Sequence, residues 1–142
     1  MPSGRSRSIG ELPQEAAAVL HGSRRAVLCT MGPDGYPHAV PVCFAVVGGD
    51  VVTAIDQKPK SGRRLARLRN VEERGVATLL FDRWDEDWRR LGWVMIGGGA
   101  RIEPPGTAVG ELSARYAQYR DDPPAGESIV VSPHRIRWWT WR

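Results

Sequence analysis

A series of short apolar runs, separated by turns rich in glycine, proline and aspartate, is the feature that most constrains the fold. Residues 25–31 are almost continuously apolar, and the Gly-Pro-Asp-Gly turn at residues 32–35 separates them from a second apolar run over residues 38–47. Runs joined by such a turn are typical of a β-hairpin. A Gly-Gly-Asp turn at residues 48–50 leads into a third run over residues 51–55. We therefore predict three consecutive strands that pair as a meander.

Further apolar runs extend this pattern along the chain. We predict strands over residues 76–81, 91–102, 129–131 and 135–141, with a bulge or a close backbone approach at the three glycines of residues 97–99. Pro41 cannot donate to a strand ladder, which places the second strand at a sheet edge or at a bulge. Six or seven strands at this short spacing indicate a mainly β (α+β) fold built on an antiparallel barrel.

Short peripheral helices are expected between the strands. Residues 12–21 have the composition of a helix, and Gly22 is placed to end it. Residues 61–70 predict a second short helix with Ser61 as its N-terminal cap. A third helix is expected to begin at the two prolines 104–105.

Length and composition are those of one globular domain. The chain has 142 residues, of which 42% are apolar and 25% charged. We expect a single domain over residues 1–142, with a flexible stretch at residues 1–8. The longest apolar run, residues 39–47, is far shorter than the roughly 20 residues that a membrane helix needs. With no signal-like apolar core near its start, the protein is expected to be cytoplasmic, without membrane insertion.

The net charge of +4 permits an anionic partner. The 16 acidic residues are interleaved with the basic ones, which favours an ordinary solvated surface over a nucleic-acid-binding face. We therefore expect no nucleic-acid partner. A protein that stacks single strands on its tryptophans is a distant alternative.

The two cysteines indicate neither a disulfide nor a metal site. In the predicted hairpin Cys29 lies opposite Val40, so that Cys43 is about 10 Å away and on the other face of the sheet. We expect both to be buried, reduced thiols. The three histidines have no metal-ligand spacing.

Only two of the 20 lysine and arginine residues are lysines, and both lie in one short segment. Lys58 and Lys60 flank Pro59, between the predicted strand that ends at Ile55 and the predicted helix that begins at Ser61. Unpaired first-turn amides, the positive end of the helix dipole, a hydroxyl and two ammonium groups together suit a phosphate. The alternative is that Ser61 only caps the helix and the lysines are solvated. Spacing alone leaves both interpretations open.

The same region resembles a known family. An Asp-Gly-x-Pro-x-x-x-Pro hairpin over residues 34–41, the Lys-Pro-Lys segment and a Leu-x-x-Leu-x-Asn pattern over residues 65–70 occur in this order and spacing. They resemble the pyridoxamine 5'-phosphate oxidase-like superfamily, and within it the actinobacterial branch assigned to the deazaflavin coenzyme F420. The resemblance extends from about Arg24 to Trp138.

This resemblance implies a split β-barrel of the FMN-binding type, assembled as a homodimer with two flavin-type cofactors in clefts between the subunits. It places the cofactor phosphate on Lys58 and Lys60, although many relatives carry arginine where Lys58 stands, and lysine lacks the two-pronged fork. The other cofactor-binding residues that it implies are Ser61 and Arg64 of the helix, Thr53, Ala54 and Ile55 at the end of the third strand, Val40 and Pro41 of the second strand, and, reaching the cofactor from the other subunit, Arg137, Trp138 and Trp139.

Five of the six tryptophans fall into two groups. Trp138, Trp139 and Trp141 occupy the predicted final strand, where alternate side chains face opposite sides of the sheet. So much apolar area at a terminus favours burial against a partner chain. Trp84 and Trp88 lie in the charged segment 82–90, which we expect to be a loop or one helical turn. They either shape a substrate cleft or only pack on the barrel.

No nucleophile constellation appears in the sequence. None is needed by the function that the resemblance implies, because a flavin-type cofactor itself carries the hydride. That function is an F420-dependent reductase whose acceptor is a small electrophile such as an enone or a quinone. An FMN-dependent oxidoreductase and a non-catalytic flavin or deazaflavin carrier are the alternatives. A basic rim of Arg63, Arg64, Arg67 and Arg69 would suit the polyglutamate tail of F420.

Overall fold

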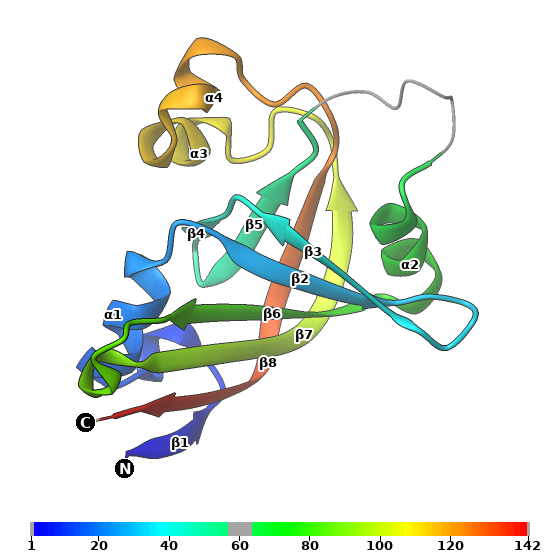
Figure 1. Ribbon diagram of the computed structural model, residues 1–142. Coiled ribbons are helices and arrows are strands. Elements are labelled where there is room, and N and C mark those ends of the chain that lie inside the picture. Colours follow the sequence, from blue (N-terminus) through cyan, green and yellow to red (C-terminus); the bar gives the residue numbers. More distant parts are fainter. Residues whose placement is uncertain (1, 57–63, 142) are drawn as a thin grey trace.

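The computed structural model describes residues 2–56 and 64–141. Its strands are β1 (Ser3–Ser6), β2 (Ala26–Met31), β3 (Pro37–Val42), β4 (Ala45–Val47), β5 (Asp50–Ala54), β6 (Val76–Arg83), β7 (Gly92–Glu103) and β8 (Ser128–Thr140). They form one curled antiparallel sheet in the order β3-β2-β6-β7-β8-β5-β4, and β1 pairs with the far end of β8 (Figure 1). The predicted mainly β, antiparallel split barrel with short peripheral helices is confirmed.

The structure has two separate hairpins where the sequence predicts a meander of three strands. Strands β2 and β3 pair with each other, and β4 pairs with β5 at the opposite edge of the sheet. The predicted single strand over residues 38–47 is wrong because the chain crosses the barrel at Phe44. This side chain is fully buried edge-on against Phe81, and its backbone N–H donates to the Tyr116 hydroxyl at 3.0 Å. A buried ring at this point prevents one straight ladder.

The register of the first hairpin also differs from the prediction by one residue. Cys29 lies opposite Ala39, and Leu28 lies opposite Val40. Both cysteines are half-buried free thiols. The expected edge position of Pro41 is confirmed, because β3 ends the sheet.

Strands β7 and β8 are the longest pair, and a bulge interrupts them. Gly97 pairs with Arg135 and Gly98 with Pro133, so His134 is an extra residue on β8. A Cβ atom on Gly98 would lie only 1.9 Å from the backbone oxygen of Ser132. The predicted bulge among the three glycines is therefore confirmed, and Gly98 is required by close backbone contact. The two C-terminal runs predicted as separate strands are one bent strand.

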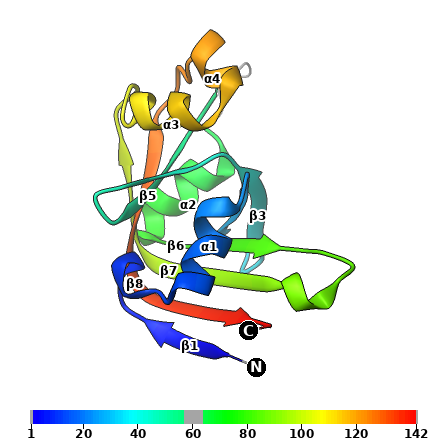
Figure 2. The ribbon, with the colours of Figure 1, turned by 90° about the vertical axis from the view of Figure 1, so that its left-hand side faces the viewer.

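In the described part of the chain, four α-helices cover the barrel: α1 (Gln14–Gly22), α2 (Ala66–Arg74), α3 (Val109–Arg115) and α4 (Ala117–Asp121). Helix α1 buries Ala16, Val19 and Leu20, which share one helical face, against β6, β7 and β8. Figures 1 and 2 show α1 and α2 on different sides of the curled sheet, with α3 and α4 at one end of it. In the described residues no helix is long and apolar enough to cross a membrane.

Helix α2 begins later than the sequence predicts. Its first residue is Ala66 and its N-terminal flanking residue is Leu65, so the predicted start with Ser61 as cap is wrong. The buried residues Leu68 and Val71 set the helix against β2 and β7, and the Asn70 amide donates to the Thr30 hydroxyl at 3.0 Å. These contacts hold the helix by its first and second turns.

The N-terminal segment takes part in the sheet. Residues 1–8 are expected to be flexible, but β1 pairs in register with residues 136–139 of β8. Gly4 lies against the Trp138 indole, where a Cβ atom would approach to 2.7 Å. Pairing and this close contact order the segment.

The bulge predicts a sharp difference between two neighbouring glycines. Gly98→Ala is expected to lower the free energy of unfolding by about 3 kcal/mol or more, because the new Cβ collides with rigid backbone. Gly97→Ala should cost about 1 kcal/mol or less, since its Cβ meets the flexible Arg135 side chain at 3.3 Å. Urea unfolding of both variants measures the difference, and equal losses would contradict the account of the bulge.

Candidate functional site

Two of the predicted site residues line one small cavity where the curled sheet is split. Pro41 comes from β3 at one edge of the sheet, and Ala54 comes from β5 near the other edge. The cavity has a volume of about 200 Å³ and is also lined by Arg25, Val42, Cys43, Asp56, Arg67 and Tyr119. We call it the Arg67 cavity. Its size is below the roughly 300–1,000 Å³ of a typical small-molecule pocket, so it suits one polar group of a ligand.

Arg67 is one of two arginines that line this cavity, the other being Arg25. Helix α2 carries Arg67, and its side chain is half buried. Burial lowers the pKa of the guanidinium, and the nearby charge of Asp56 partly opposes that shift. Its Nε atom is buried, with no hydrogen-bond partner in the part of the chain that the structure describes. An orphaned donor of this kind costs about 1–3 kcal/mol, and an anion in the cavity would satisfy it.

Asp56 is held by a buried tyrosine. The Tyr119 hydroxyl, on α4, donates a hydrogen bond to the Asp56 carboxylate. Tyr119 is 5% exposed, and burial first and this hydrogen bond second raise the pKa of its phenol. The pairing occupies one oxygen of Asp56 and places the carboxylate at the cavity wall.

The side chains of three other residues predicted to bind the cofactor face the barrel core. Thr53 and Ile55 are 0% and 4% exposed, on the face of β5 that packs into the barrel. Val40 is half buried against the same core. Their side chains do not line the Arg67 cavity, whereas Ala54, between them in sequence, does.

The basic segment lies largely outside the described residues. Lys58, Lys60, Ser61 and Arg63 belong to this part of the chain. Arg64 is described and precedes α2, and its guanidinium donates to Glu72 and, at 2.7 Å, to Glu127. These carboxylates, Glu127 first, raise its pKa. Of the four arginines expected at a basic rim, Arg64 is thus ion-paired, Arg67 faces the cavity and Arg69 is exposed.

The predicted C-terminal contacts are far from the Arg67 cavity within one chain. Ala54 pairs with Ser128, whereas Arg137 is nine residues further along β8, about 30 Å away at strand rise. Trp138 packs against the core and beneath β1, and Arg137 and Trp139 lie on the outer face of the sheet. One chain alone does not bring these residues to the cofactor region.

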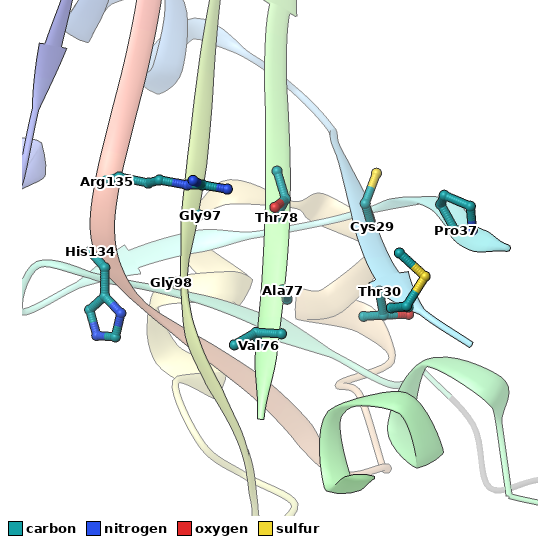
Figure 3. A pocket seen from close by; sticks show the side chains of 11 residues that line it. Cys29, Thr30, Pro37, Val76, Ala77, Thr78, Gly97, Gly98, His134 and Arg135 are labelled. Atoms are coloured by element: carbon teal, nitrogen blue, oxygen red, sulfur yellow. The ribbon is translucent and has the colours of Figure 1, made fainter. Parts of the chain in front are cut away.

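Sequence reasoning missed a second cavity, on the outer face of the sheet beside α2. It has a volume of about 460 Å³, and Figure 3 shows its residues on β2, β3, β6, β7 and β8. The His134 imidazole and the Arg135 guanidinium line it, and Thr78, Gly97 and Gly98 lie beside them. We call it the bulge cavity. The three glycines were a signal for it, because a strand without side chains leaves room over the sheet.

A third cavity, of about 530 Å³, lies further along the same face. Half-buried Leu80, Trp93, Met95 and Trp139 line it, and the exposed Trp84 stands at its rim. We call it the tryptophan cavity. Trp88, also exposed, lies next to Trp84 with ring centroids 6.5 Å apart. The expected loop or helical turn at residues 82–90 is confirmed as a loop with one short 3-10 turn, Trp88–Arg90.

The chain matches one protein family over most of its length. A sequence profile described as pyridoxamine 5'-phosphate oxidase matches residues 12–140. No curated protein matches the chain.

Solved structures share this fold at low sequence identity. The conserved hypothetical protein Rv2991 from Mycobacterium tuberculosis has a TM-score of 0.70 and 22% identity, covering 89% of this chain and 82% of that one. A protein described as an F420 reductase has a TM-score of 0.65 and 20% identity, with coverages of 88% and 98%. A heme binding protein from Mycobacterium smegmatis has a TM-score of 0.65 and 19% identity, with coverages of 89% and 52%. At these identities the likeness shows the fold and leaves the ligand open.

The Tyr119–Asp56 contact predicts an unusual alkaline titration. The chain has three tyrosines. The phenol of Tyr119 should lose its proton at a pH well above the ordinary tyrosine pKa of about 10. The contribution of this hydrogen bond to stability is then present at neutral pH and is lost only as pH rises through the raised pKa. Tyrosinate absorbance measures this step. Tyr119→Phe should remove the late step and the matched variant Tyr36→Phe should keep it; a late step that survives in Tyr119→Phe would contradict the assignment.

Proposed function

The chain belongs to the pyridoxamine 5'-phosphate oxidase family, and we propose that it is an oxidoreductase whose cofactor is the deazaflavin F420. The family binds flavins or deazaflavins and includes oxidoreductases. The observation that carries the proposal is the half-buried Arg67 guanidinium, whose Nε has no partner among the described residues. It faces a cavity sized for a phosphate rather than for a tricyclic ring.

The residues of this chain fit the phosphate end of such a cofactor. Arg67 supplies a buried donor, and the Arg67 cavity ends at Asp56, two positions before Lys58. Lys58 and Lys60 would complete the cluster of positive charge, with Ser61 adding a hydroxyl donor. A phosphate held by guanidinium and ammonium groups gains charge-assisted hydrogen bonds, which are about twice as strong as neutral ones.

The ring of the cofactor must lie outside the small Arg67 cavity. Pro41 and Ala54 line the Arg67 cavity from the two edges of the split sheet. They would orient the ribityl chain, which joins the phosphate to the ring. When bound, a reduced deazaflavin or flavin supplies the hydride. The protein then binds, orients and excludes water, so no catalytic side chain is assigned.

Three observations favour coenzyme F420 over FMN as the cofactor. The sequence resembles the F420-assigned branch of the superfamily, and a protein described as an F420 reductase shares the fold. Arg69 is exposed on α2 and remains available for a polyglutamate tail, which FMN lacks. The alternative hypotheses are an FMN-dependent oxidoreductase and a non-catalytic carrier. As the acceptor we propose a small electrophile such as an enone or quinone.

We also propose that the protein acts as a homodimer through the outer face of its sheet. An antiparallel sheet that faces water carries polar side chains on that side. Here the outward residues Leu80, Trp93, Met95 and Trp139 are apolar and surround the tryptophan cavity. An apolar patch of this kind is typical of an interface. A second copy would also bring its C-terminal Arg137 and Trp139 toward the cofactor of the first.

The proposed phosphate site predicts a ligand-selective loss of affinity. Arg67→Gln, and separately the double variant Lys58→Ala with Lys60→Ala, should weaken binding of F420 and FMN about 10- to 100-fold, because each removes charge-assisted bonds. Binding of riboflavin, which has the ring without phosphate, should change little. Fluorescence titration of wild type and variants measures these affinities, with Arg74→Gln at the far end of α2 as the control.

The same titration separates the alternatives. Tight FMN binding without affinity for F420 would move the function to a flavin-dependent enzyme. Reduced cofactor that no acceptor of a broad enone and quinone panel reoxidises would indicate a carrier. Unchanged FMN affinity in both variants would refute the phosphate site.

The proposed interface predicts a change of assembly. Wild type should have twice the mass of the chain in light scattering coupled to size-exclusion chromatography. Met95→Glu should give the monomer, because it places a charge in the apolar face. Ala18→Glu, on the exposed side of α1, should leave the dimer intact. A wild-type monomer, or a Met95→Glu dimer with native circular dichroism, would refute this interface.

A further inference from the structure

The bulge cavity holds charged groups that the proposed phosphate site does not use. In a regular strand, consecutive side chains point to opposite faces. The extra residue on β8 changes this, so that His134 and Arg135, although consecutive, both line the bulge cavity. The irregularity that Gly98 makes possible thus brings two donor side chains to one place.

The glycines of β7 let these side chains lie close to the sheet. A Cβ atom on Gly97 would lie 3.3 Å from Arg135 Nε, and one on Gly99 would lie 3.5 Å from His134 Cε1. Figure 3 shows the Arg135 side chain extended across β7 at Gly97 toward Thr78 on β6. The guanidinium therefore lies along the sheet over the cavity floor, while Arg135 stays exposed to solvent.

The charge of this cavity is unbalanced. The described residues that line it include no aspartate or glutamate. Within residues 2–56 and 64–141, neither the His134 nor the Arg135 side chain has an ion pair or hydrogen bond, whereas Arg64, Arg89 and Arg101 each pair with carboxylates. Arg137 adds a further positive charge, since it and Arg135 line the adjoining space over Thr78. A planar guanidinium without a partner is a receptor for a carboxylate, which it can bind with two parallel hydrogen bonds.

Apart from Thr30 and Thr78, the remaining side chains of the cavity wall are apolar. They are those of Cys29, Met31, Pro37, Val76 and Ala77. The volume of about 460 Å³ lies within the range of small-ligand pockets. A ligand that satisfies both parts has an acidic group at one end and a flat, apolar body.

We propose that the bulge cavity binds the carboxylate of a small acid with a planar, unsaturated body, through Arg135 with His134 as a second donor. The cavity lies on the same face as the tryptophan cavity, but next to the end of α2, where Val76 lines it, and beyond the apolar patch assigned to the second subunit.

The test uses cinnamate and its neutral methyl ester, which have the same planar body and differ in charge. Calorimetric titration of the full-length dimer without cofactor should show at least about tenfold tighter binding of the acid than of the ester, as one charge-assisted bond provides. Arg135→Gln should abolish this preference, and His134→Gln should reduce it. Arg74→Gln, an exposed arginine of α2 without an ion pair among the described residues, should keep it. Size-exclusion chromatography confirms that all variants keep the wild-type assembly.

Equal binding of acid and ester by wild type, or a full acid preference in Arg135→Gln, would overturn the proposal. The proposed function is tested separately by cofactor titration of the same samples. An Arg135-dependent acid preference in a protein that binds neither F420 nor FMN would keep the acid site and refute the proposed cofactor. Cofactor binding without acid preference would refute the acid site alone.

Discussion

Pairing of the two long strands β7 and β8 is the constraint on which the rest of the structure depends. Strand β8 spans thirteen residues and pairs with β7 along its length, with β5 at one end and with β1 at the other. A strand of this length must bend to close a barrel, and the bulge at Gly97 and Gly98 supplies the bend. The bend carries β5 up to the split of the sheet, where the Arg67 cavity lies.

The barrel uses its two sheet faces for different purposes. The inner face buries Leu28, Leu79, Ile96 and Ile136 in one core. The outer face also carries apolar side chains. They line the tryptophan cavity and part of the bulge cavity, where Arg135 adds a positive charge. Core packing alone explains the inner residues only. The outer ones are accounted for by the proposed second subunit and by the proposed acidic ligand.

The crossing at Phe44 links the site to the helices. Tyr116 accepts the Phe44 N–H and donates to the Arg24 carbonyl oxygen, so the end of α3 is tied to both hairpins. Tyr119, one turn further, holds Asp56 at the Arg67 cavity. The position of the cavity wall therefore depends on contacts between segments more than sixty residues apart in sequence.

The sequence by itself determined the mainly β fold class and most strand positions, because turn residues and apolar runs are local signals. It also predicted that Pro41 lies at a sheet edge or a bulge, and that the three glycines mark a bulge or a close backbone approach. It also identified the family. Only the tertiary structure decided that β3 and β4 separate at Phe44, that α2 begins at Ala66 and that Arg67 is half buried in a cavity. It also decided that His134 and Arg135 share a face. Each of these depends on distant partners, such as Phe81 for Phe44 and Thr30 for α2, and the spacing of residues along one segment carries no record of them.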